Sequence, residues 1–319
     1  MKVCFIGLGS IGTRHLKNLV KIFDEYNLNL EIHALRRTQK PLSLDIKSLI
    51  NCEIFNESDL CDDYDMTFIT NPNNVHYDSI KLMANKTKSM FIEKPIFDNI
   101  HYDISKLNLR KNGIYYVAGP LKFSQVVQSL KQILINEKIY SIRAICSSYL
   151  PNWRKGIDYR NVYSAKKIQG GGVCIDLIHE WDYITYLFGF PLETFNINGK
   201  YSHLEIDSED ISIYIARYKD KLVEIHLDYF GRVPQRKIEI FTKNGTITGD
   251  FIGNSISFSD GRETIDFTKE NKDMYVEEMK YFIKNVMTSQ TGHSYIEHAY
   301  KVLKLEIGRA SCRERVFAG

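Results

Sequence analysis

The sequence has 319 residues, 44% of them hydrophobic and 25% charged, and carries a formal net charge of +3. This length is sufficient for two domains with separate cores, and the composition is that of an ordinary globular protein with no sign of nucleic-acid binding. No stretch approaches the roughly 20 apolar residues of a membrane span, and six cysteines without CxxC or metal-ligand spacing indicate reduced thiols, so we expect a cytoplasmic protein without a metal.

The first 120 residues alternate between strand and helix patterns. Strands are expected at 2–9, 30–35, 52–55, 65–70, 89–95 and 113–119, with helices at 13–23 and 76–85. Strands separated by helical segments predict βαβ units and a doubly wound parallel sheet, the Rossmann fold. We therefore expect residues 1–120 to form a first, cofactor-binding α/β domain.

After residue 120 the pattern changes to that of an α+β domain with a large, open, mainly antiparallel sheet. The expected elements are a helix at 124–137, strands at 139–150, 209–218, 222–230, 236–242, 245–251 and 255–259, and closing helices at 274–285 and 295–305. The turn at Lys243-Asn244-Gly245 is typical of a hairpin. Residues 121–305 are therefore expected to form a second, substrate-binding and oligomerisation domain.

The last residues differ in composition from the rest of the chain. The string EIGRASCRERV, which begins at residue 306, resembles the translation of a common sequencing-library adapter. We therefore expect residues 306–319 to be a foreign tail and the native sequence to differ beyond Leu305. A genomic read that continues unbroken through the codons of residues 307–319 would contradict this expectation.

The hexapeptide GLGSIG (7–12) follows the first expected strand and precedes the first expected helix. Its glycines allow the backbone to approach a pyrophosphate, and a helix N-terminus supplies N–H donors and a favourable dipole. The cofactor-binding residues expected here are Gly7, Gly9, Ser10, Ile11 and Gly12. The alternative is a tight turn between strand and helix that holds no ligand.

The second expected strand ends in Arg36 and Arg37, not in the acidic residue that binds the ribose 2′-hydroxyl of NAD. A guanidinium fork suits the 2′-phosphate of NADP, and no acid ends this strand to repel it. The cofactor is thus expected to be NAD(P), with NADP(H) favoured. The alternative is a pair of solvated surface arginines.

The tripeptide Glu93-Lys94-Pro95 follows the fifth expected strand, at the edge where ligands bind in open α/β sheets. Proline restricts the residue before it, so the ammonium of Lys94 is expected to have a fixed direction. A cation beside a reacting hydroxyl stabilises the developing alkoxide. The alternative is one more solvated lysine in a lysine-rich chain.

Residues 170–183, GGGVCIDLIHEWDY, place several titratable groups on a mostly apolar segment after three glycines. The segment reads as one helix, with Asp176 and His179 on the same face and Glu180 on a neighbouring, structural face. An amphipathic surface helix and a catalytic face in a cleft both fit this pattern.

Four motifs occur in the order GLGSIG, TNPNNVH (70–76), IEKP and GGGVCIDLIHEWD. In this order they resemble the Gfo/Idh/MocA family, named after glucose-fructose oxidoreductase and inositol dehydrogenase, over nearly the whole chain up to Leu305. The resemblance implies an NAD(P)-dependent oxidoreductase of a sugar, nucleotide sugar or cyclitol. It also implies a homo-oligomer, a dimer or tetramer, with contacts through the open sheet.

The resemblance also implies roles for individual residues. The family's catalytic residues correspond to Lys94, Asp176 and His179, with the substrate hydroxyl between Lys94 and His179 and its proton passing to His179. Asp176 would orient the substrate or His179. The further cofactor-binding residues are Thr70, Asn71, Pro72, His76, Glu93 and Lys94. For His76, a role at a helix start is the alternative.

Two features depart from the family pattern. Many members space the aspartate and histidine by four residues, whereas Asp176 and His179 are three apart. Spacings of three and four both lie on one helical face, so the pair is still expected to converge. The common Arg-Phe after the sixth strand is Lys122-Phe123 here, and Lys122 is expected to contact the substrate.

Residues 148–167 form a polar, aromatic-rich loop before the glycines. The loop offers flat apolar surfaces for a sugar ring and charged groups for a phosphate or carboxylate. The expected substrate-binding residues in it are Trp153, Arg154, Asp158, Tyr159, Arg160 and Tyr163. The alternative is a loop packed on the sheet with solvated charges. The loop also resembles a family subgroup found among bacterial surface-polysaccharide genes, which implies a nucleotide-linked or modified sugar.

Two rival classes compete with a dehydrogenase. HEWDY lacks the second histidine of HExxH, which excludes the zinc-protease pattern. A non-catalytic NAD(P)-binding sensor or scaffold with the same fold is the main alternative. The joint presence of Lys94, Asp176 and His179 favours the enzyme, because a protein that only binds the cofactor does not need them.

Overall fold

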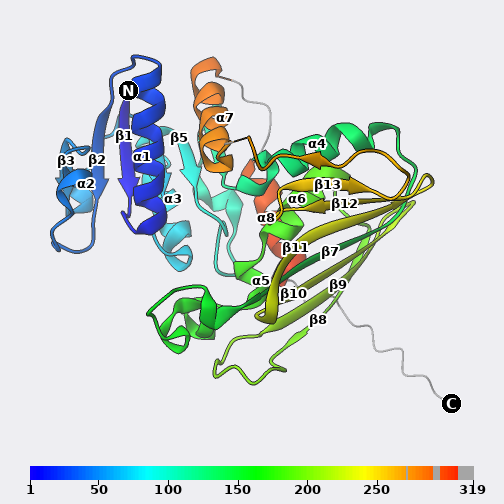
Figure 1. Ribbon diagram of the computed structural model, residues 1–319. Coiled ribbons are helices and arrows are strands. Elements are labelled where there is room, and N and C mark those ends of the chain that lie inside the picture. Colours follow the sequence, from blue (N-terminus) through cyan, green and yellow to red (C-terminus); the bar gives the residue numbers. More distant parts are fainter. Residues whose placement is uncertain (271, 290–294, 308–319) are drawn as a thin grey trace. The chain divides into compact units, whose positions relative to one another are not determined.

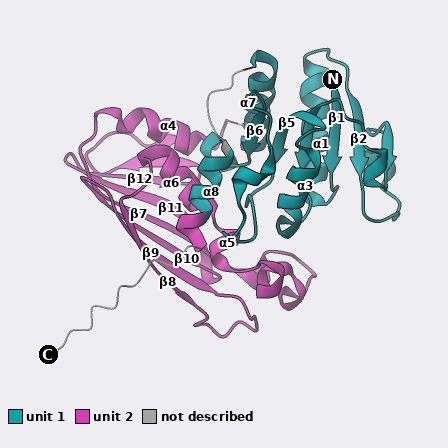
Figure 2. Ribbon diagram, turned by 180° about the vertical axis from the view of Figure 1, so that it is seen from behind, with its two compact units in different colours: residues 1–123, 272–303 teal, residues 124–271, 304–319 magenta. Residues whose placement is uncertain are grey.

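The computed structural model describes residues 1–270, 272–289 and 295–307. The chain forms two compact units, which Figure 2 colours separately. Unit 1 comprises residues 1–123 and 272–303, and unit 2 comprises the described residues of 124–271 and 304–319. The segment 272–303, which was expected in the second domain, therefore lies in unit 1.

Unit 1 is built on a six-stranded sheet in the order β3-β2-β1-β4-β5-β6, with every neighbouring pair parallel. The strands are β1 (Lys2–Ile6), β2 (Glu31–Leu35), β3 (Cys52–Ile54), β4 (Tyr64–Ile69), β5 (Thr87–Ile92) and β6 (Ile114–Val117). This order confirms the predicted Rossmann sheet. Its strands are short and mostly buried, as expected for strands covered on both faces.

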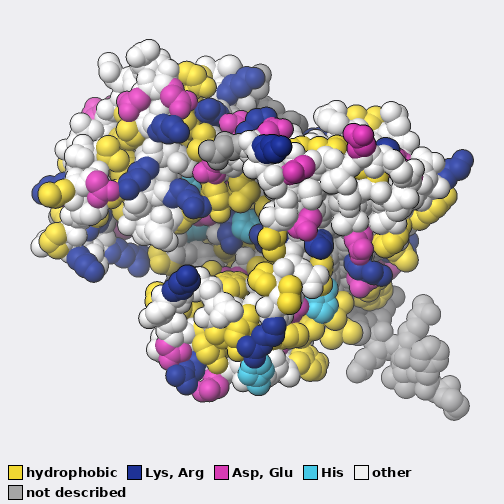
Figure 3. Space-filling view, viewed as in Figure 1, with side chains coloured by type: hydrophobic (Ala, Val, Ile, Leu, Met, Phe, Trp, Pro, Cys, Tyr) yellow, Lys and Arg dark blue, Asp and Glu magenta, His cyan; other side chains and the backbone are white. Residues whose placement is uncertain are grey.

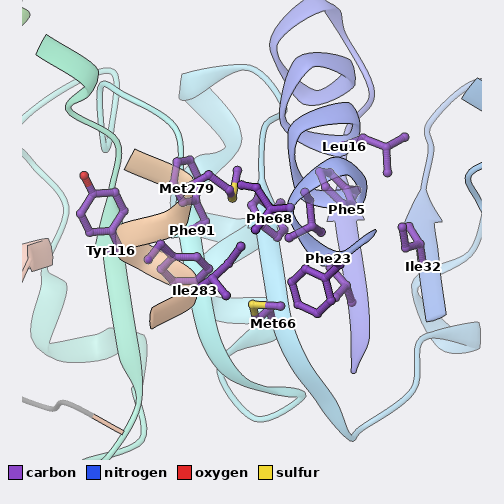
Figure 4. Packing of buried hydrophobic residues seen from close by; sticks show 14 of the residues in the cluster. Phe5, Leu16, Phe23, Ile32, Met66, Phe68, Phe91, Tyr116, Met279 and Ile283 are labelled. Carbon is purple, nitrogen blue, oxygen red and sulfur yellow. The ribbon is translucent and has the colours of Figure 1, made fainter. Parts of the chain in front are cut away.

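The helices of unit 1 come from both ends of the chain (Figure 1). They are α1 (Ser10–Glu25), α2 (Leu44–Lys47), α3 (His76–Met83), α7 (Met274–Thr288) and the first part of α8 (Tyr295–Ile307), with 3-10 turns η1 (Glu57–Asp59), η2 (Asn73–Val75), η3 (Ile104–Leu107) and η4 (Pro120–Phe123). Figure 4 shows Phe23 of α1 and Met279 of α7 in one apolar cluster with Phe68 of β4. This shared core is the physical reason why α7 belongs to unit 1.

Unit 2 is built on an eight-stranded sheet in the order β14-β13-β12-β11-β7-β10-β9-β8. The strands are β7 (Ile139–Tyr149), β8 (Glu193–Gly199), β9 (Ile211–Arg217), β10 (Leu222–Asp228), β11 (Phe230–Thr242), β12 (Thr246–Asp250), β13 (Ser255–Phe258) and β14 (Ile265–Asp266). Only the β7–β10 pair is parallel. The predicted large, mainly antiparallel sheet is confirmed.

The two faces of this sheet differ. The helices of unit 2 are α4 (Gln125–Ile133), α5 (Val173–Asp176) and α6 (His179–Phe188), with 3-10 turns η5 (Leu134–Asn136), η6 (Leu150–Asn152), η7 (Tyr159–Asn161), η8 (Tyr163–Ala165) and η9 (Lys167–Gln169). Helices α4 and α6 cover one face, on which Ala144 of β7 is buried (Figure 1). On the other face, Arg143 forms ion pairs with Glu224 at 3.5 Å and Glu239 at 3.4 Å.

The expectation of one continuous helix after the glycines is wrong. The chain forms a four-residue helix, α5, and then a separate helix, α6. The break lies at Leu177, whose φ of -102° and ψ of 21° leave the helical region. Asp176 therefore ends one helix and His179 begins the next, so a shared helical face does not bring the two residues together.

The predicted foreign tail lies outside the described residues apart from Glu306 and Ile307, which end α8. Glu306 is fully buried, and burial raises its pKa well above the usual value. Neither carboxylate oxygen of Glu306 has a hydrogen-bond partner among the described residues.

None of the described helices has the length and apolarity needed to cross a bilayer. Within the same residues, no cluster of three or more His, Cys, Asp or Glu side chains has a geometry suited to a metal ion.

Candidate functional site

The glycine loop connects β1 to α1, and its glycines have different steric surroundings. Gly7 has a φ of +93°, in the region that favours glycine. A Cβ on Gly12 would lie 2.6 Å from the carbonyl oxygen of Gly7, whereas a Cβ on Gly9 would meet nothing within 4 Å. Helix α1 has no capping side chain and no acidic residue in its first turn. The open space at Gly9 and the uncapped N–H groups of Ser10 and Ile11 fit a pyrophosphate.

The turn after β4 supports the glycine loop. The Oγ1 of Thr70 donates to the carbonyl oxygen of Gly7 at 2.6 Å, and the Nδ2 of Asn71 donates to the Oγ of Ser79 at 2.7 Å. The Oδ1 of Asn71 is buried and has no hydrogen-bond partner among the described residues. Pro72 is exposed just before η2. Thr70 is thus used within the fold, while the amide oxygen of Asn71 is an acceptor that a ligand can satisfy.

Glu93 connects the turn after β5 to helix α1. Its Oε1 lies 2.5 Å from the Nε2 of His15, and its Oε2 accepts the backbone N–H of Lys94 at 3.1 Å. Burial would raise the pKa of Glu93, but the hydrogen bond from His15 and the charges of His15 and Lys94 together lower that pKa. The buried side chain of Glu93 is therefore an ionised acceptor inside the fold, and its expected contact with the cofactor stays a prediction.

His76, the first residue of α3, lies between two turns at the carboxyl edge of the sheet. Its Nε2 is 2.9 Å from the carbonyl oxygen of Asn71, and its Nδ1 is 3.1 Å from that of Pro95 and 3.2 Å from that of Ile96. The ring is buried, and burial lowers its pKa. His76 therefore connects the turns after β4 and β5 from inside and begins α3, the alternative expected for it, while its contact with the cofactor stays a prediction.

Arg36 and Arg37 have different surroundings. The guanidinium of Arg36 forms an ion pair with Glu53 of β3 and donates to the carbonyl oxygen of Lys40. Arg37 is exposed and forms no ion pair with any residue in the described part of the chain. An anionic ligand can therefore reach Arg37, whereas Arg36 is already engaged.

Lys122 lies in η4, directly after β6, and belongs to unit 1. A buried acid, Glu278 of α7, accepts hydrogen bonds nearby from the hydroxyl of Tyr116 at 2.8 Å and from the backbone N–H of Gly119 at 2.6 Å. Burial raises the pKa of Glu278 to about 8, and the charge of Lys122 opposes this rise only in part. The carboxyl edge of the sheet thus contains one ionised and one largely protonated glutamate at neutral pH.

In unit 2, the glycine run brings the aromatic loop close to α5. A Cβ on Gly171 would lie 2.0 Å from the carbonyl oxygen of Tyr163, so only glycine permits this approach. Gly170 and Gly172 have φ values of +75° and +140°, which glycine adopts without strain. The three glycines therefore fix Tyr163 beside the helix that carries Asp176.

Asp176 is buried and is held by two tyrosines. The hydroxyl of Tyr229 donates to its Oδ2 at 2.5 Å, and the hydroxyl of Tyr163 donates to its Oδ1. Burial, followed by the charge of Asp176, raises the pKa of both tyrosines. Both phenols therefore remain protonated donors at neutral pH, and the carboxylate is fixed from two sides.

His179 and Glu180 begin α6 in different environments. His179 is half-buried, whereas Glu180 is fully buried. The Oε1 of Glu180 lies 2.7 Å from the Nη2 of Arg236 in β11. Glu180 is therefore part of a buried ion pair in the core of unit 2, and only part of the charged cluster in the glycine motif is available for chemistry.

The aromatic loop divides into two groups of side chains. Trp153 contacts the ring of Tyr229 edge-on at 5.2 Å, and the guanidinium of Arg154 lies 5.8 Å from the ring of Tyr163. Both residues therefore gather around the tyrosines that hold Asp176. Figure 3 shows hydrophobic and charged side chains mixed over this loop, in the lower part of the view.

The second group lies against residues 203–207. Arg160 pairs with Asp158 at 2.9 Å and with Glu205 at 3.1 Å, and the hydroxyl of Tyr159 accepts the backbone N–H of Glu205 at 3.2 Å. The charges of Asp158 and Arg160 thus neutralise each other. Of the two arginines expected to bind an anion, only Arg154 has no ion-pair partner among the described residues.

Three residues of the site do not follow from the sequence motifs: His15, Tyr229 and Glu278. His15 lies three positions after Gly12, on the buried face of α1, and a histidine there signals a polar partner inside the fold. Glu278 lies on the buried face of α7, where an acidic residue likewise signals a polar partner inside the fold. Tyr229 follows β10 directly and has no comparable local signal, because its partner Asp176 is 53 positions away.

Comparisons with known proteins match both units. The family model described as an oxidoreductase family with an NAD-binding Rossmann fold matches residues 1–106, and the GFO/IDH/MocA C-terminal domain matches residues 127–248. Myo-inositol 2-dehydrogenase of Thermotoga maritima is 24% identical over 314 residues, which cover 91% of this chain and 89% of that protein.

Two solved structures have the same fold. Levoglucosan dehydrogenase in complex with NADH and levoglucosan is 14% identical, with a TM-score of 0.80 over 96% of this chain and 95% of the other. UDP-N-acetylglucosamine 3-dehydrogenase of Acidithiobacillus ferrooxidans is 16% identical, with a TM-score of 0.72 over 97% of this chain and 98% of the other. At these identities the likeness concerns the fold.

Proposed function

The chain belongs to the Gfo/Idh/MocA oxidoreductases with an NAD-binding Rossmann fold, and from this premise we propose that it transfers hydride between a nicotinamide cofactor and a sugar-like substrate. The observation that carries the proposal is the fixed state of two expected catalytic residues. The backbone N–H of Lys94 donates a hydrogen bond to the buried carboxylate of Glu93. The carboxylate of Asp176 accepts hydrogen bonds from the hydroxyls of two tyrosines. Fold alone does not define an activity, so the proposal rests on how these two residues are held.

The residues of unit 1 fit NAD(P). The loop from Gly7 to Gly12 would hold the pyrophosphate against the start of α1, where Gly9 leaves open space. The buried Oδ1 of Asn71 would accept a hydrogen bond from the cofactor. When bound, the cofactor supplies the acceptor or donor of the hydride.

Three side chains would act on the substrate. Lys94 stabilises the oxygen of the reacting carbon while that oxygen carries negative charge. His179 accepts the hydroxyl proton in the oxidative direction and returns it in the reductive direction, a role suited to an imidazole near neutral pH. Asp176, held by Tyr163 and Tyr229, is a fixed acceptor that orients the substrate or His179.

We propose NADP(H) as the preferred cofactor, with Arg37 as the partner of the 2′-phosphate. Arg37 is exposed and has no ion pair with a described residue, whereas Arg36 is engaged by Glu53. A free guanidinium binds a phosphate through two parallel hydrogen bonds. This refines the expectation from the sequence, in which both arginines bind the 2′-phosphate equally.

The substrate class proposed is a sugar, nucleotide sugar or cyclitol. Similar proteins support this substrate class, because they include a myo-inositol 2-dehydrogenase, a levoglucosan dehydrogenase and a UDP-N-acetylglucosamine 3-dehydrogenase. Trp153 and Tyr163 offer ring faces near Asp176, and Arg154 offers an unneutralised cation beside Tyr163. These groups favour a sugar that carries a phosphate or carboxylate.

The test is a substrate panel with both nicotinamide cofactors. Myo-inositol, levoglucosan, UDP-N-acetylglucosamine and related nucleotide sugars are incubated with the full chain, and NAD(P)H absorbance is followed. We expect turnover of at least one sugar, and we expect His179→Ala to lower kcat by about 10²- to 10⁴-fold while NADPH still binds. Lys94→Ala is expected to be similarly impaired.

The same panel distinguishes the rival function. A chain that binds NADPH tightly but turns over no member of the panel would favour the non-catalytic sensor. Turnover that survives in both Lys94→Ala and His179→Ala would remove the assigned roles, even if the chain is an enzyme.

We also propose a cytoplasmic homo-oligomer, a dimer or tetramer, that associates through the open face of the unit 2 sheet. Phe195 and Ile197 of β8 are 53% and 71% exposed, and Phe195 lies opposite Ile215 of β9, which is 44% exposed. Exposed apolar residues on neighbouring strands favour burial against a second copy. Light scattering should give a multiple of the chain mass that Phe195→Asp reduces.

A further inference from the structure

We propose that the buried pair His15–Glu93 is a positioning device for Lys94, which links the cofactor-binding helix α1 to the catalytic lysine. This inference rests on the role proposed above for Lys94. No motif of the sequence assigns a function to His15, and the proposed mechanism does not use it.

The link is a continuous series of hydrogen bonds within unit 1. The Nε2 of His15 lies 2.5 Å from the Oε1 of Glu93, and the Oε2 of the same carboxylate accepts the backbone N–H of Lys94 at 3.1 Å. His15 lies in the second turn of the helix whose first turn borders the glycine loop. One carboxylate therefore joins the helix that receives the pyrophosphate to the backbone of Lys94.

The surroundings of the pair define the direction of its hydrogen bond. The side chains of His15 and Glu93 are 0% and 10% exposed, and the His15 ring lies 4.8 Å from that of Phe91. The Nδ1 of His15 is buried without a partner among the described residues. Because an ionised carboxylate can only accept, the Nε2 of His15 carries a hydrogen and donates it to Glu93.

A carboxylate in this place needs both of its donors. Loss of His15 would leave Glu93 buried with one oxygen unpaired, which disfavours its ionised form. The negative charge of Glu93 also attracts the Lys94 ammonium, as the lowered pKa of Glu93 reflects in part. Glu93 thus acts on Lys94 twice, through the backbone N–H and through its charge.

A second imidazole holds the other side of the lysine. The Nδ1 of His76 lies 3.1 Å from the carbonyl oxygen of Pro95, and its Nε2 lies 2.9 Å from that of Asn71. Lys94 is therefore flanked by Glu93, held by His15, and by Pro95, held by His76. The half-buried Lys94 therefore lies between two residues that are held by buried imidazoles.

The test measures Lys94 directly and needs no substrate. The full chain is labelled with acetic anhydride across a pH series, and peptide mass spectrometry gives the pH at which Lys94 is half-labelled. Glu93→Gln keeps an oxygen for the Lys94 N–H but removes the charge, and His15→Leu removes the donor. His15→Gln restores a donor amide at nearly the same reach.

A matched control exists in the same unit. His33 is 7% exposed, and its Nε2 lies 2.9 Å from the Oε1 of Glu31, while its Nδ1 lies 2.9 Å from the Tyr64 hydroxyl. In this second imidazole–carboxylate pair the imidazole is buried, whereas the Glu31 side chain is 54% exposed. Both residues belong to β2 and not to the turn of Lys94. His33→Leu reports what the loss of a buried histidine alone does to labelling.

We expect the pH of half-labelling of Lys94 to fall by at least about half a unit in Glu93→Gln and His15→Leu, because the ammonium loses its nearby anion. His15→Gln and His33→Leu are expected to match the wild type. Unchanged labelling in Glu93→Gln, with the protein still folded by circular dichroism, would overturn the inference, as would an equal shift in His33→Leu. Turnover by Lys94→Ala would instead overturn the proposed function, so the two failures are distinguishable.

Discussion

The hydroxyl of Tyr229 lies 2.5 Å from the Oδ2 of Asp176, and this contact joins a residue at the end of β10 to the end of α5. Tyr163 donates to the other oxygen of the same carboxylate. A buried carboxylate with a hydrogen-bond donor on each oxygen has a fixed orientation. The geometry of Asp176 is therefore set by two tyrosines, one from the aromatic loop and one from the sheet.

Tyr229→Phe should impair catalysis more than it impairs folding. Loss of one hydrogen bond to a charged group corresponds to about 1.5–3 kcal/mol, so kcat/KM with the best substrate of the panel should fall about 10- to 100-fold. The matched control is Tyr218→Phe, because Tyr218 is similarly buried in unit 2 but donates to the carbonyl oxygen of Gly189. Equal kinetic losses in the two variants would contradict a specific role for Tyr229.

Two glycines of the same loop should respond differently to alanine. A Cβ on Gly9 meets nothing within 4 Å, so Gly9→Ala should fold as the wild type but bind NADPH at least about 10-fold more weakly, because the methyl group lies where the pyrophosphate approaches. A Cβ on Gly12 lies 2.6 Å from the carbonyl oxygen of Gly7, so Gly12→Ala should lose about 1–3 kcal/mol of stability.

Fluorescence titration with NADPH and thermal unfolding separate the two effects. If Gly9→Ala binds NADPH as tightly as the wild type, the glycine loop does not hold the pyrophosphate. If Gly12→Ala is as stable as the wild type, the close approach of the loop to α1 is not required.

The two arginines after β2 should have separable effects. Arg37→Ala should weaken NADPH binding about 10-fold or more and change NADH binding little, because the exposed guanidinium is the free partner for a 2′-phosphate. Arg36→Ala should mainly reduce stability, because it leaves the partly buried Glu53 without its ion pair. Dissociation constants for both cofactors measure this, and an unchanged preference in Arg37→Ala would remove the argument for NADP(H).

Much of the fold can be predicted because its signals are local. Apolar runs separated by helical segments define the parallel sheet, and a glycine-rich turn between a strand and a helix points to its carboxyl edge. The position of Lys94 directly after the fifth strand places it at the same edge. Each of these patterns involves only residues that are close in the sequence, within a single βα unit.

The remaining features depend on partners that are distant in the sequence. The ion pair of Arg36 with Glu53 spans two strands, and Tyr229 reaches Asp176 across 53 positions. Neither contact follows from spacing. The break at Leu177 has no local signal either, because the apolar pattern of the segment is helical on both sides of it. These are the points at which tertiary contacts override local preference.

The fold should lose stability as pH rises from about 4.5 to about 8 because of Glu278. Burial raises its pKa from 4.5 to about 8, with the charge of Glu93 acting in the same direction and that of Lys122 against it. Within this window the native state keeps a proton that the unfolded chain has released. Each rise in pH therefore lowers the free energy of unfolding. The total effect is at most a few kcal/mol, at about 1.4 kcal/mol for each unit of pKa shift.

Glu278→Gln provides the comparison, because glutamine has the same shape, keeps an oxygen for the N–H of Gly119 and does not titrate. Unfolding free energies are measured by urea denaturation at pH 5, 6, 7, 8 and 9. The unfolding free energy of the variant minus that of the wild type should increase up to about pH 8 and then stay constant. His76 contributes the opposite slope in acid, since burial lowers its pKa, but it does so in both proteins and cancels in the difference. Parallel stability curves for the two proteins would mean that Glu278 is already ionised in the native state, and that the buried acid at the edge of the sheet carries a charge.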